Sequence, residues 1–393
     1  MKILYIGGEP LPGSGGGSVH FTEVTEGLKK LGWDVMVCVP MEDGYPDEEN
    51  IGGLKIIRVN MKLKGKTFPI LALKRWRKFI DFNPDILMER YVTFGGACSI
   101  LSQKLKKPVV LEVNSPHTKE FIFRFGIKNR LIIFLLNKWS EFQFKCANKV
   151  VSTLDTVIPE FARDKFIAVE WAANNDLFNP GAINEKERMD LKKQLSINDE
   201  PVVIFLGTFR NWHGISHLPL IIKNVVSEVP CVKFILIGEG SERKSVEDKI
   251  RSLSLQDSVR FTGVVPYKNV PLYLSLGTIG IAPYDRSEYP PLKEFGFFWS
   301  PLKIFEYMAA KMPVVTIDIA PLNRLVENGK RGYVVAEGDY RAFSDKIIEL
   351  LKSPDRCSIM GKTARDFVCE NYSWKKHVDH LNSELIQLIS GKR

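Results

Sequence analysis

The chain has 393 residues, of which 45% are hydrophobic and 26% charged, with 6 cysteines and a formal net charge of +9. This balance is typical of a globular protein with a substantial core, and the length suggests two domains. It excludes a disordered chain and a small disulfide scaffold, and the absence of any C-x2-C pair disfavours a zinc site. No apolar run approaches the roughly 18 residues that span a bilayer, and the apolar start is too short for a signal peptide. We therefore expect a cytoplasmic protein.

The positive charge is unevenly distributed. Residues 51–150 hold 20 Lys and Arg against 6 Asp and Glu. The two densest parts, 62–78 and 121–138, interleave cations with aromatic and aliphatic residues. That pattern is typical of a surface lying on lipid headgroups, so we expect peripheral attachment to an anionic membrane surface through both parts. The alternative is a solvated basic face beside a helix packed into the core. No nucleic-acid recognition motif accompanies the charge, so no nucleic-acid partner is expected.

The first half of the chain alternates short apolar runs with helical patterns. The predicted strands are 2–6, 35–39, 54–59, 86–89, 109–113 and 150–152. A glycine-rich loop follows the first strand and leads into a predicted helix over 19–31, and a long helical region occupies 119–146. Strands alternating with helices predict βαβ units and a parallel sheet.

A turn-rich stretch at 178–184 and a polar stretch up to Pro201 interrupt this alternation, which indicates a domain linker. The alternation then restarts, and the chain ends in helical patterns over 341–388. The predicted strands of the second half are 202–206, 232–237, 259–262, 279–282, 314–316 and 333–335. The sequence therefore predicts an α/β protein with two Rossmann-like domains, 1–180 and 181–372.

Each domain has a loop suited to bind an anion. Glycines at 13 and 15–17 lie between the first strand and its helix, where the backbone can approach a ligand closely. Their spacing is not G-x-G-x-x-G, and Pro40 and Met41 stand where a dehydrogenase needs an acidic residue, so a plain tight turn is the alternative reading. In the second domain Arg210 follows a predicted strand and can clamp a phosphate. The two loops together suggest a diphosphate held between the domains.

Six motifs carry a resemblance to a known family. They are GGGSVHFTEV (15–24), GTFRNWHG (207–214), LIGEGSER (236–243), FTGVVPYKNVPLYLSLGTIGIAPY (261–284), SPLKIFEYMAAKMPVV (300–315) and YSWKKHVDHL (372–381). In this order they resemble the family-four retaining glycosyltransferases, or group 1 glycosyltransferases, of GT-B architecture. The resemblance implies two Rossmann-like domains facing across a cleft. An acceptor-binding domain, 1–180, would be joined by the C-terminal helix, about 373–393. The nucleotide-sugar-binding domain would be 181–372.

The resemblance also implies roles for single residues. Glu306 would bind the nucleotide ribose, Arg210 and Lys303 would neutralise the donor diphosphate, and Val265 would pack on the nucleobase. His213 stands where a lysine is more usual, so the sequence leaves open whether this residue is charged at neutral pH. The remaining expected donor-binding residues are Gly16, Gly17, Gly238, Gly240, Ser300, Pro301 and Leu302. Asn114 and His117 are catalytic candidates, with Glu112 beside them, and His20 and Arg90 are acceptor-side candidates. A surface salt bridge is the alternative for Arg90.

Two positions depart from the family pattern. Relatives often have a glutamate eight residues before Glu306, but Phe298 stands there, and Glu294 lies at a different spacing. Many relatives have a histidine after the fifth strand, where this chain has Asn114, with His117 three residues later. We therefore expect a variant donor-sugar pocket.

The expected function is retaining, hexosyltransferase-type transfer from a nucleotide-diphosphate sugar to a glycan or lipid-linked acceptor, in polysaccharide or cell-envelope biosynthesis. No D-x-D motif is present to hold a metal, so no metal and no cofactor besides the donor is expected. Two alternatives stay open. One is a nucleotide-sugar epimerase of the same architecture, and the other is a non-catalytic nucleotide-sugar-binding protein.

Overall fold

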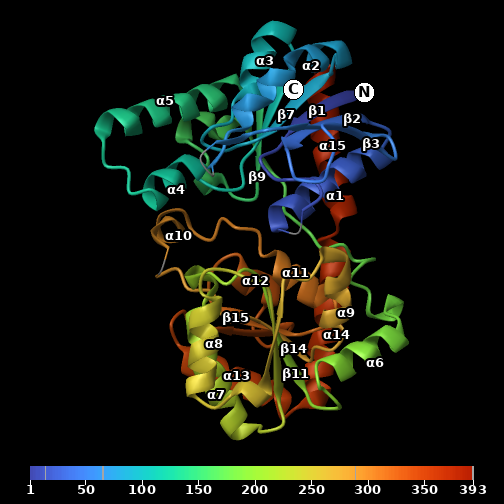
Figure 1. Ribbon diagram of the computed structural model, residues 1–393, viewed down its shortest axis with the longest axis vertical. Helices are drawn as coiled ribbons and strands as arrows, with labels where there is room; N and C mark the ends of the chain where they lie inside the picture. The colour runs from blue at the N-terminus through green and yellow to red at the C-terminus, as the bar shows by residue number, and fades with distance from the viewer. Residues whose placement is uncertain (14, 64–65, 288, 392–393) are drawn as a thin grey trace. The chain divides into compact units, whose positions relative to one another are not determined.

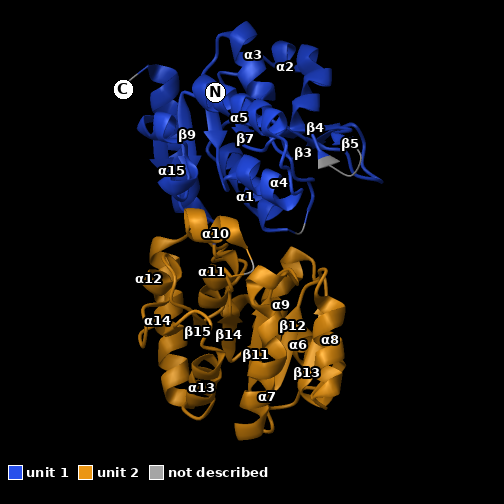
Figure 2. Ribbon diagram, turned by 90° about the vertical axis from the view of Figure 1, so that its left-hand side faces the viewer, with its two compact units in different colours: residues 1–171, 298–300, 374–393 blue, residues 172–297, 301–373 orange. Residues whose placement is uncertain are grey.

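The computed structural model describes the chain apart from residues 14, 64–65, 288 and 392–393. The chain forms two compact units, drawn in different colours in Figure 2. Unit 1 comprises Met1–Trp171, Phe298–Ser300 and Trp374–Arg393, and unit 2 comprises Ala172–Phe297 and Pro301–Ser373. Each unit has one mainly parallel sheet with helices packed on it, as the alternating pattern predicts (Figure 1).

Unit 1 is built on an eight-stranded sheet with the order β10-β9-β8-β7-β1-β2-β4-β3. Its strands are β1 (Lys2–Ile6), β2 (Asp34–Pro40), β3 (Glu48–Ile51), β4 (Leu54–Val59), β7 (Ile86–Arg90), β8 (Val109–Glu112), β9 (Lys149–Ser152) and β10 (Phe166–Ala168). Only β3 is antiparallel to its neighbour, at one edge. Strands β5 (Lys62–Leu63) and β6 (Lys66–Thr67) form a separate hairpin.

The helices of unit 1 are α1 (Gly16–Lys30), α2 (Trp76–Phe82), α3 (Ala97–Leu105), α4 (His117–Arg124), α5 (Arg130–Cys146) and α15 (Trp374–Ser390). The C-terminal helix α15 packs on α1, where Val378, Leu381 and Leu385 share a buried cluster with Leu28. A side chain at Gly27 would collide with Val378, so this glycine lets the two helices meet. The end of the chain therefore completes the core of unit 1, as expected.

The helical region expected over 119–146 is two helices rather than one. Helix α4 ends at Arg124, and Gly126 then adopts a left-handed backbone with a φ of +56°. The Asn129 side chain accepts hydrogen bonds from the N–H groups of Leu131 (3.0 Å) and Ile132 (3.2 Å). A left-handed glycine followed by an asparagine N-cap ends one helix and starts the next.

Unit 2 is built on a six-stranded parallel sheet with the order β13-β12-β11-β14-β15-β16. Its strands are β11 (Val202–Leu206), β12 (Lys233–Ile237), β13 (Val259–Gly263), β14 (Ile279–Ala282), β15 (Val314–Ile317) and β16 (Gly332–Val335). Its helices are α6 (Glu185–Gln194), α7 (Leu218–Glu228), α8 (Arg243–Ser252), α9 (Val270–Leu274), α10 (Pro290–Phe295), α11 (Leu302–Ala309), α12 (Leu322–Val326), α13 (Tyr340–Leu351) and α14 (Pro354–Asn371). Among the helices of the described residues, none is long and apolar enough to cross a membrane.

Unit 2 begins at Ala172, before the turn-rich stretch near residue 180 where the sequence places the boundary. Phe178 is buried, and the Arg365 guanidinium of α14 donates hydrogen bonds to the Phe178 carbonyl oxygen and to Asn179 Oδ1, both at 3.1 Å. Ala173 also forms a bridge with Ser373. These contacts attach residues 172–179 to unit 2, whereas composition reveals only the exposed turn that follows them.

Candidate active-site residues in the two units

Each sheet has one point where the strand order reverses, between β1 and β7 in unit 1 and between β11 and β14 in unit 2. Ligands of open α/β sheets bind beyond the carboxyl ends of the strands at such a point. Arg90 is the last residue of β7, Gly207 directly follows β11, and Tyr284 lies two residues after β14. The candidate residues of each unit therefore lie where this kind of sheet holds a ligand.

Lys303 in unit 2 is a buried lysine whose ammonium has no hydrogen-bond partner among the described residues. Its Nζ atom lies 4.5 Å from the centre of the Phe205 ring and 5.0 Å from that of Tyr284. No hydrogen-bond acceptor reaches this atom in the described part of the chain. A Cβ at Gly207 would lie 2.7 Å from Nζ, so only glycine lets the ammonium approach the end of β11. An unpaired buried ammonium is costly and is poised to receive an anion.

Glu306 lies one helical turn after Lys303 on α11 and is also buried. Burial lowers the pKa of Lys303 to about 7, an effect that the charge of Glu306 opposes. Burial likewise raises the pKa of Glu306 to about 8, and here the charge of Lys303 opposes the shift. Both groups therefore change protonation near neutral pH, so a bound ligand can change the charge that each carries.

His213 lies near the same lysine. Its Nδ1 atom is 2.7 Å from the carbonyl oxygen of Thr208, so Nδ1 carries the proton and donates it. Burial and the Lys303 cation hold the pKa of His213 well below its usual value. His213 is therefore neutral near pH 7 and cannot supply the cation that a lysine would supply at this position.

Arg210 is the other basic residue of the loop after β11. Its guanidinium lies 5.8 Å from the Trp212 ring centre, and no acidic side chain pairs with it among the residues that the structure describes. Val265 is half-buried in the loop that follows β13. Ser300 and Pro301 directly precede α11, and the Ser300 hydroxyl is buried without a hydrogen-bond partner in the described structure. Leu302 and Lys303 form the first turn of α11, whose N–H groups point toward the helix start.

Gly238 and Gly240 have a packing role. A side chain at Gly238 would collide with the carbonyl oxygen of Gly207, and one at Gly240 would collide with the backbone of Phe209. The Phe209 N–H also donates to the Glu239 carbonyl oxygen at 2.9 Å. These two glycines therefore let the loops after β11 and β12 pack against each other. This packing is a structural reason for glycine at two positions that the sequence analysis expects to bind the donor.

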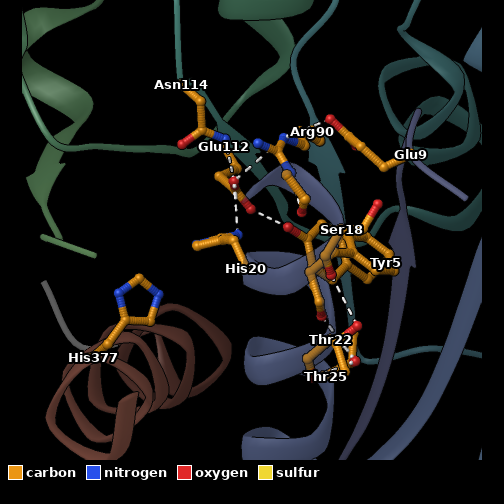
Figure 3. A network of polar contacts seen from close by, with 12 residues as sticks. Tyr5, Glu9, Ser18, His20, Thr22, Thr25, Arg90, Glu112, Asn114 and His377 are labelled. Carbon is orange, nitrogen blue, oxygen red and sulfur yellow. Dashed lines mark hydrogen bonds and ion pairs between the residues drawn. The ribbon is translucent and has the colours of Figure 1, made fainter. Parts of the chain in front are cut away.

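Glu112, the last residue of β8, is the centre of a buried polar network in unit 1 (Figure 3). Its carboxylate accepts hydrogen bonds from the Tyr5 hydroxyl and from the Asn114 amide nitrogen. His20 Nδ1 lies 3.4 Å and Arg90 Nε 3.7 Å from Glu112 Oε1. Because Asn114 turns its nitrogen toward Glu112, its Oδ1 oxygen faces away from the carboxylate and can accept a hydrogen bond.

Arg90 joins this network to the first turn of α1. Its Nε atom lies 3.4 Å from Glu9 Oε1, and its Nη1 atom donates to the Gly17 carbonyl oxygen at 2.9 Å. A Cβ at Gly17 would lie 3.0 Å from Glu9 and 3.3 Å from Arg90, so a larger residue would press on this pair. Helix α1 begins at Gly16, three residues before the predicted start. Arg90 thus forms the salt bridge weighed as its alternative role, but the residue is buried rather than at the surface.

His20 of α1 is enclosed by aromatic residues. Its ring stacks on Trp171 with centres 4.3 Å apart and meets His377 of α15 edge-on at 5.1 Å. Burial, and next the neighbouring His377 and Arg90, hold the pKa of His20 well below its usual value. Figure 3 shows His377 on α15 near this network. His20 is therefore a neutral, enclosed ring.

His117, at the start of α4, is held apart from this network. Its Nδ1 atom accepts a hydrogen bond from the Thr93 N–H (3.1 Å) and lies 2.7 Å from the Thr93 hydroxyl. Burial, followed by Arg90 and Arg124, lowers its pKa to about 4. Within the described chain no hydrogen bond or ion pair joins His117 to Glu112 or Asn114. The structure thus brings Asn114, His20 and Arg90 together around Glu112 but leaves His117 out.

The comparisons with known proteins cover both units. Residues 187–367 match the family model described as "Glycosyl transferases group 1", and residues 14–165 match "Glycosyltransferase Family 4". The chain is a family-four glycosyltransferase. An uncharacterized glycosyltransferase of Methanocaldococcus jannaschii is 24% identical over 99% of both chains. The alpha-D-kanosaminyltransferase of Streptomyces kanamyceticus is 26% identical, but the match spans only 51% of this chain and 49% of that enzyme.

Solved structures support the GT-B fold of this glycosyltransferase. The sucrose-phosphate synthase of Thermosynechococcus elongatus superposes with a TM-score of 0.76 at 18% identity, covering 99% of each chain. The Anabaena protein HepE, solved in complex with UDP-glucose, superposes with a TM-score of 0.70 at 15% identity over 98% of this chain and 100% of that one. At these identities the likeness concerns the fold alone.

The sequence missed the aromatic surroundings of the glycosyltransferase's basic residues. Phe205 and Tyr284, which enclose Lys303, looked like ordinary strand and loop residues. Tyr5 and Trp171 were likewise not anticipated beside Glu112 and His20. Phe298, at the position of the missing glutamate, is fully buried. Among the described residues, no three His, Cys, Asp or Glu side chains gather as a metal site.

Proposed function

We propose that this glycosyltransferase moves a sugar from a nucleotide-diphosphate sugar to a glycan or lipid-linked acceptor, with retention of configuration and without a metal ion. The buried ammonium of Lys303, unpaired within the described chain and next to Gly207, is the observation that carries the proposal. A diphosphate would offset the cost of burying that cation. Arg210 would add a second positive charge from the loop after β11.

The same residues give a mechanism. Lys303, Arg210 and the N–H groups at the start of α11 would stabilise the negative charge that grows on the diphosphate as the sugar–phosphate bond breaks. The acceptor oxygen would bond to the anomeric carbon on the face that the phosphate leaves, and the phosphate would take the acceptor's proton. No separate general base is then required. Because His213 is neutral, Lys303 and Arg210 would be the side chains that balance the negative charge of the diphosphate.

Glu306 would bind the nucleotide through its ribose. A carboxylate accepts two hydroxyl hydrogen bonds through its two oxygens. Because burial raises the pKa of Glu306 to about 8, the donor would have to favour the ionised form on binding. The bound UDP-glucose of the Anabaena structure supports a nucleotide-hexose donor for this family-four fold.

In unit 1 the proposed role of Asn114 is to offer its Oδ1 oxygen to a substrate hydroxyl, with Glu112 fixing the amide. His20 and Arg90 would shape the acceptor side and support Glu112. His117, bonded to Thr93, would hold the start of α4 in place. A lipid-linked acceptor would have the enzyme working at the cytoplasmic face of a membrane.

A thermal-shift screen with nucleoside diphosphates and nucleotide sugars tests the donor class, because a ligand raises stability by RT ln(1 + [L]/Kd). The donor that binds is then incubated with acceptor extract, with and without EDTA, and the product anomer is assigned by NMR. We expect transfer with retention that EDTA leaves intact. Binding without transfer would identify a non-catalytic binding protein, and donor conversion without acceptor an epimerase. No stabilisation by any member of the panel would refute the donor site.

A further inference from the structure

The helices α4 and α5 expose an apolar cluster that is unusually dense. Eighteen large hydrophobic side chains of the described residues are exposed, and six of them fall between residues 123 and 135. We call these six the α4–α5 tip, and they are between 45% and 65% exposed: Phe123, Phe125, Leu131, Ile132, Phe134 and Leu135. Single exposed apolar residues are ordinary, but a contiguous patch marks an interaction surface.

Among the described residues, the side-chain hydrogen bonds that attach α5 to the rest of unit 1 come from its C-terminal half. The buried residues of this helix are Gln143 and Phe144, near its C-terminal end. Trp139 Nε1 donates to the Gly95 carbonyl oxygen at 3.0 Å, and Ser140 shares a hydrogen bond with Tyr91 at 2.7 Å. In the described part of the chain no hydrogen bond of this kind comes from the first turns of α5, and in Figure 1 this helix extends away from the sheet of unit 1. The N-terminal half of α5 is therefore a preformed helix with most of its side chains exposed.

The apolar side chains gather on one face of that half. Leu131, Phe134 and Leu135 have the spacing i, i+3, i+4, which places them on one helical stripe. Ile132 widens the stripe on one side. Phe123 and Phe125 come from the end of α4 and the turn after it. Two helices thus contribute to one apolar surface.

The segment that carries this apolar surface is rich in cations and has no carboxylate. Residues 121–138 contain Arg124, Lys128, Arg130 and Lys138 and no Asp or Glu. Lys138 pairs with Glu141 at 2.7 Å. The other three are exposed and have no acidic partner among the described residues. Apolar side chains flanked by exposed cations suit an anionic lipid surface.

The other basic stretch, 62–78, differs in this respect. Lys62 pairs with Glu42 at 2.9 Å, Arg75 with Asp47 at 2.6 Å and Lys78 with Glu48 at 2.6 Å. Acidic residues of segment 42–48 thus pair with three of the seven cations of this stretch. Lys64 and Gly65 of this stretch lie outside the described residues. Of the two stretches expected to attach to a membrane, we therefore keep only 121–138 for the proposal below.

We propose that the α4–α5 tip inserts its apolar side chains among the headgroups of a bilayer containing anionic lipid, with Arg124, Lys128 and Arg130 facing the lipid charge. A second copy of the chain is the less suitable occupant, because two tips packed against each other would bring their cations together. This inference goes beyond the proposed function, since attachment needs no sugar transfer.

Co-sedimentation of the full chain with vesicles tests whether the α4–α5 tip binds anionic lipid. Vesicles of phosphatidylcholine alone are compared with vesicles that also contain phosphatidylglycerol, at low and high salt. We expect binding to the anionic vesicles that weakens as salt rises, because exposed charges are screened. Replacing Leu131, Phe134 and Leu135 by Ser should weaken this binding about tenfold or more, since three inserted side chains are lost. Replacing Arg124, Lys128 and Arg130 by Ser should remove the preference for anionic lipid.

Two matched controls make the same kinds of substitution, apolar to Ser and cation to Ser, at exposed positions outside the α4–α5 tip. Leu220 and Ile359 are exposed apolar residues of unit 2, and replacing both by Ser should leave vesicle binding unchanged. Lys74 and Arg77 of the other basic stretch, replaced by Ser, should likewise have little effect. Thermal stability and nucleoside-diphosphate binding of every variant should match the parent, which separates this surface from the donor site.

Three results would overturn the proposal. They are no binding at low salt, equal binding to neutral and anionic vesicles, and binding that survives the Leu131, Phe134 and Leu135 replacements. Concentration-dependent self-association that the same replacements abolish would assign the tip to a second copy instead.

Discussion

Replacing Lys303 by Met should make the protein more stable and remove its affinity for nucleoside diphosphates. Burial lowers the pKa of this lysine from 10.5 to about 7. One pKa unit corresponds to about 1.4 kcal/mol, so keeping the ammonium buried costs at most about 5 kcal/mol. Methionine is an unbranched side chain that matches lysine up to Cε but lacks the ammonium, and its thioether suits the rings of Phe205 and Tyr284. After allowance for imperfect packing we expect a gain of about 1–3 kcal/mol.

The direction of the pKa shift decides whether Lys303 raises or lowers the stability of the fold. A lysine whose pKa is lower in the folded than in the unfolded state costs stability at every pH below the unfolded value, 10.5. The cost is greatest below about pH 7 and disappears as pH rises to 10.5. The advantage of the Lys303→Met variant should therefore be full in acidic and neutral buffer and vanish in strongly alkaline buffer.

Thermal unfolding with and without a nucleoside diphosphate measures both effects. A gain of 1 kcal/mol raises Tm by about 2–4 °C in a domain of this size, so the variant should unfold a few degrees higher. Added nucleoside diphosphate should no longer raise its Tm. Lys362→Met is the matched control, because Lys362 is an exposed lysine of α14 and should change neither quantity. A variant with a lower Tm that still responds to the ligand would refute the reasoning.

Four further outcomes are expected. Arg210→Ala should lower kcat more than donor affinity, because its charge acts mainly on the leaving diphosphate; a raised KM with unchanged kcat would contradict this. Glu306→Ala should weaken nucleoside-diphosphate binding by about 2–4 kcal/mol in calorimetric titration without loss of Tm, and unchanged affinity would remove its ribose role. In a Glu306→Gln variant, affinity should fall from pH 7 to 9, because Lys303 must take up a proton to hold the anion; a flat profile would count against Lys303. Glu112→Gln should destabilise unit 1 by about 2–4 kcal/mol and lower turnover, yet leave nucleoside-diphosphate affinity intact.

The buried strands could be predicted because a parallel sheet covered on both faces needs continuous apolar runs. Strands β1 and β11 have the predicted bounds, Lys2–Ile6 and Val202–Leu206. Strand β3, Glu48–Ile51, escaped prediction because an edge strand is paired on one side only and tolerates charged, exposed residues. The break between α4 and α5 was missed because Phe125 and Ile127 continue the apolar pattern while the backbone turns at Gly126.

The sequence could name the residues proposed for the site, but it could not predict their electrostatic states. The chemistry of Lys303 depends on the ring of Phe205 in β11, on the ring of Tyr284 after β14 and on a glycine nearly a hundred positions earlier. No local pattern therefore reveals that its ammonium is buried and unpaired within the described chain. The same separation hides the orientation of Asn114, which is set by the carboxylate of Glu112 and thus by the Tyr5 and Arg90 that hold it. A motif can only nominate the side chains expected to meet a ligand. Their protonation and direction are decided by groups that the fold brings together from far along the chain, and the proposed stabilisation of a departing diphosphate depends on both properties.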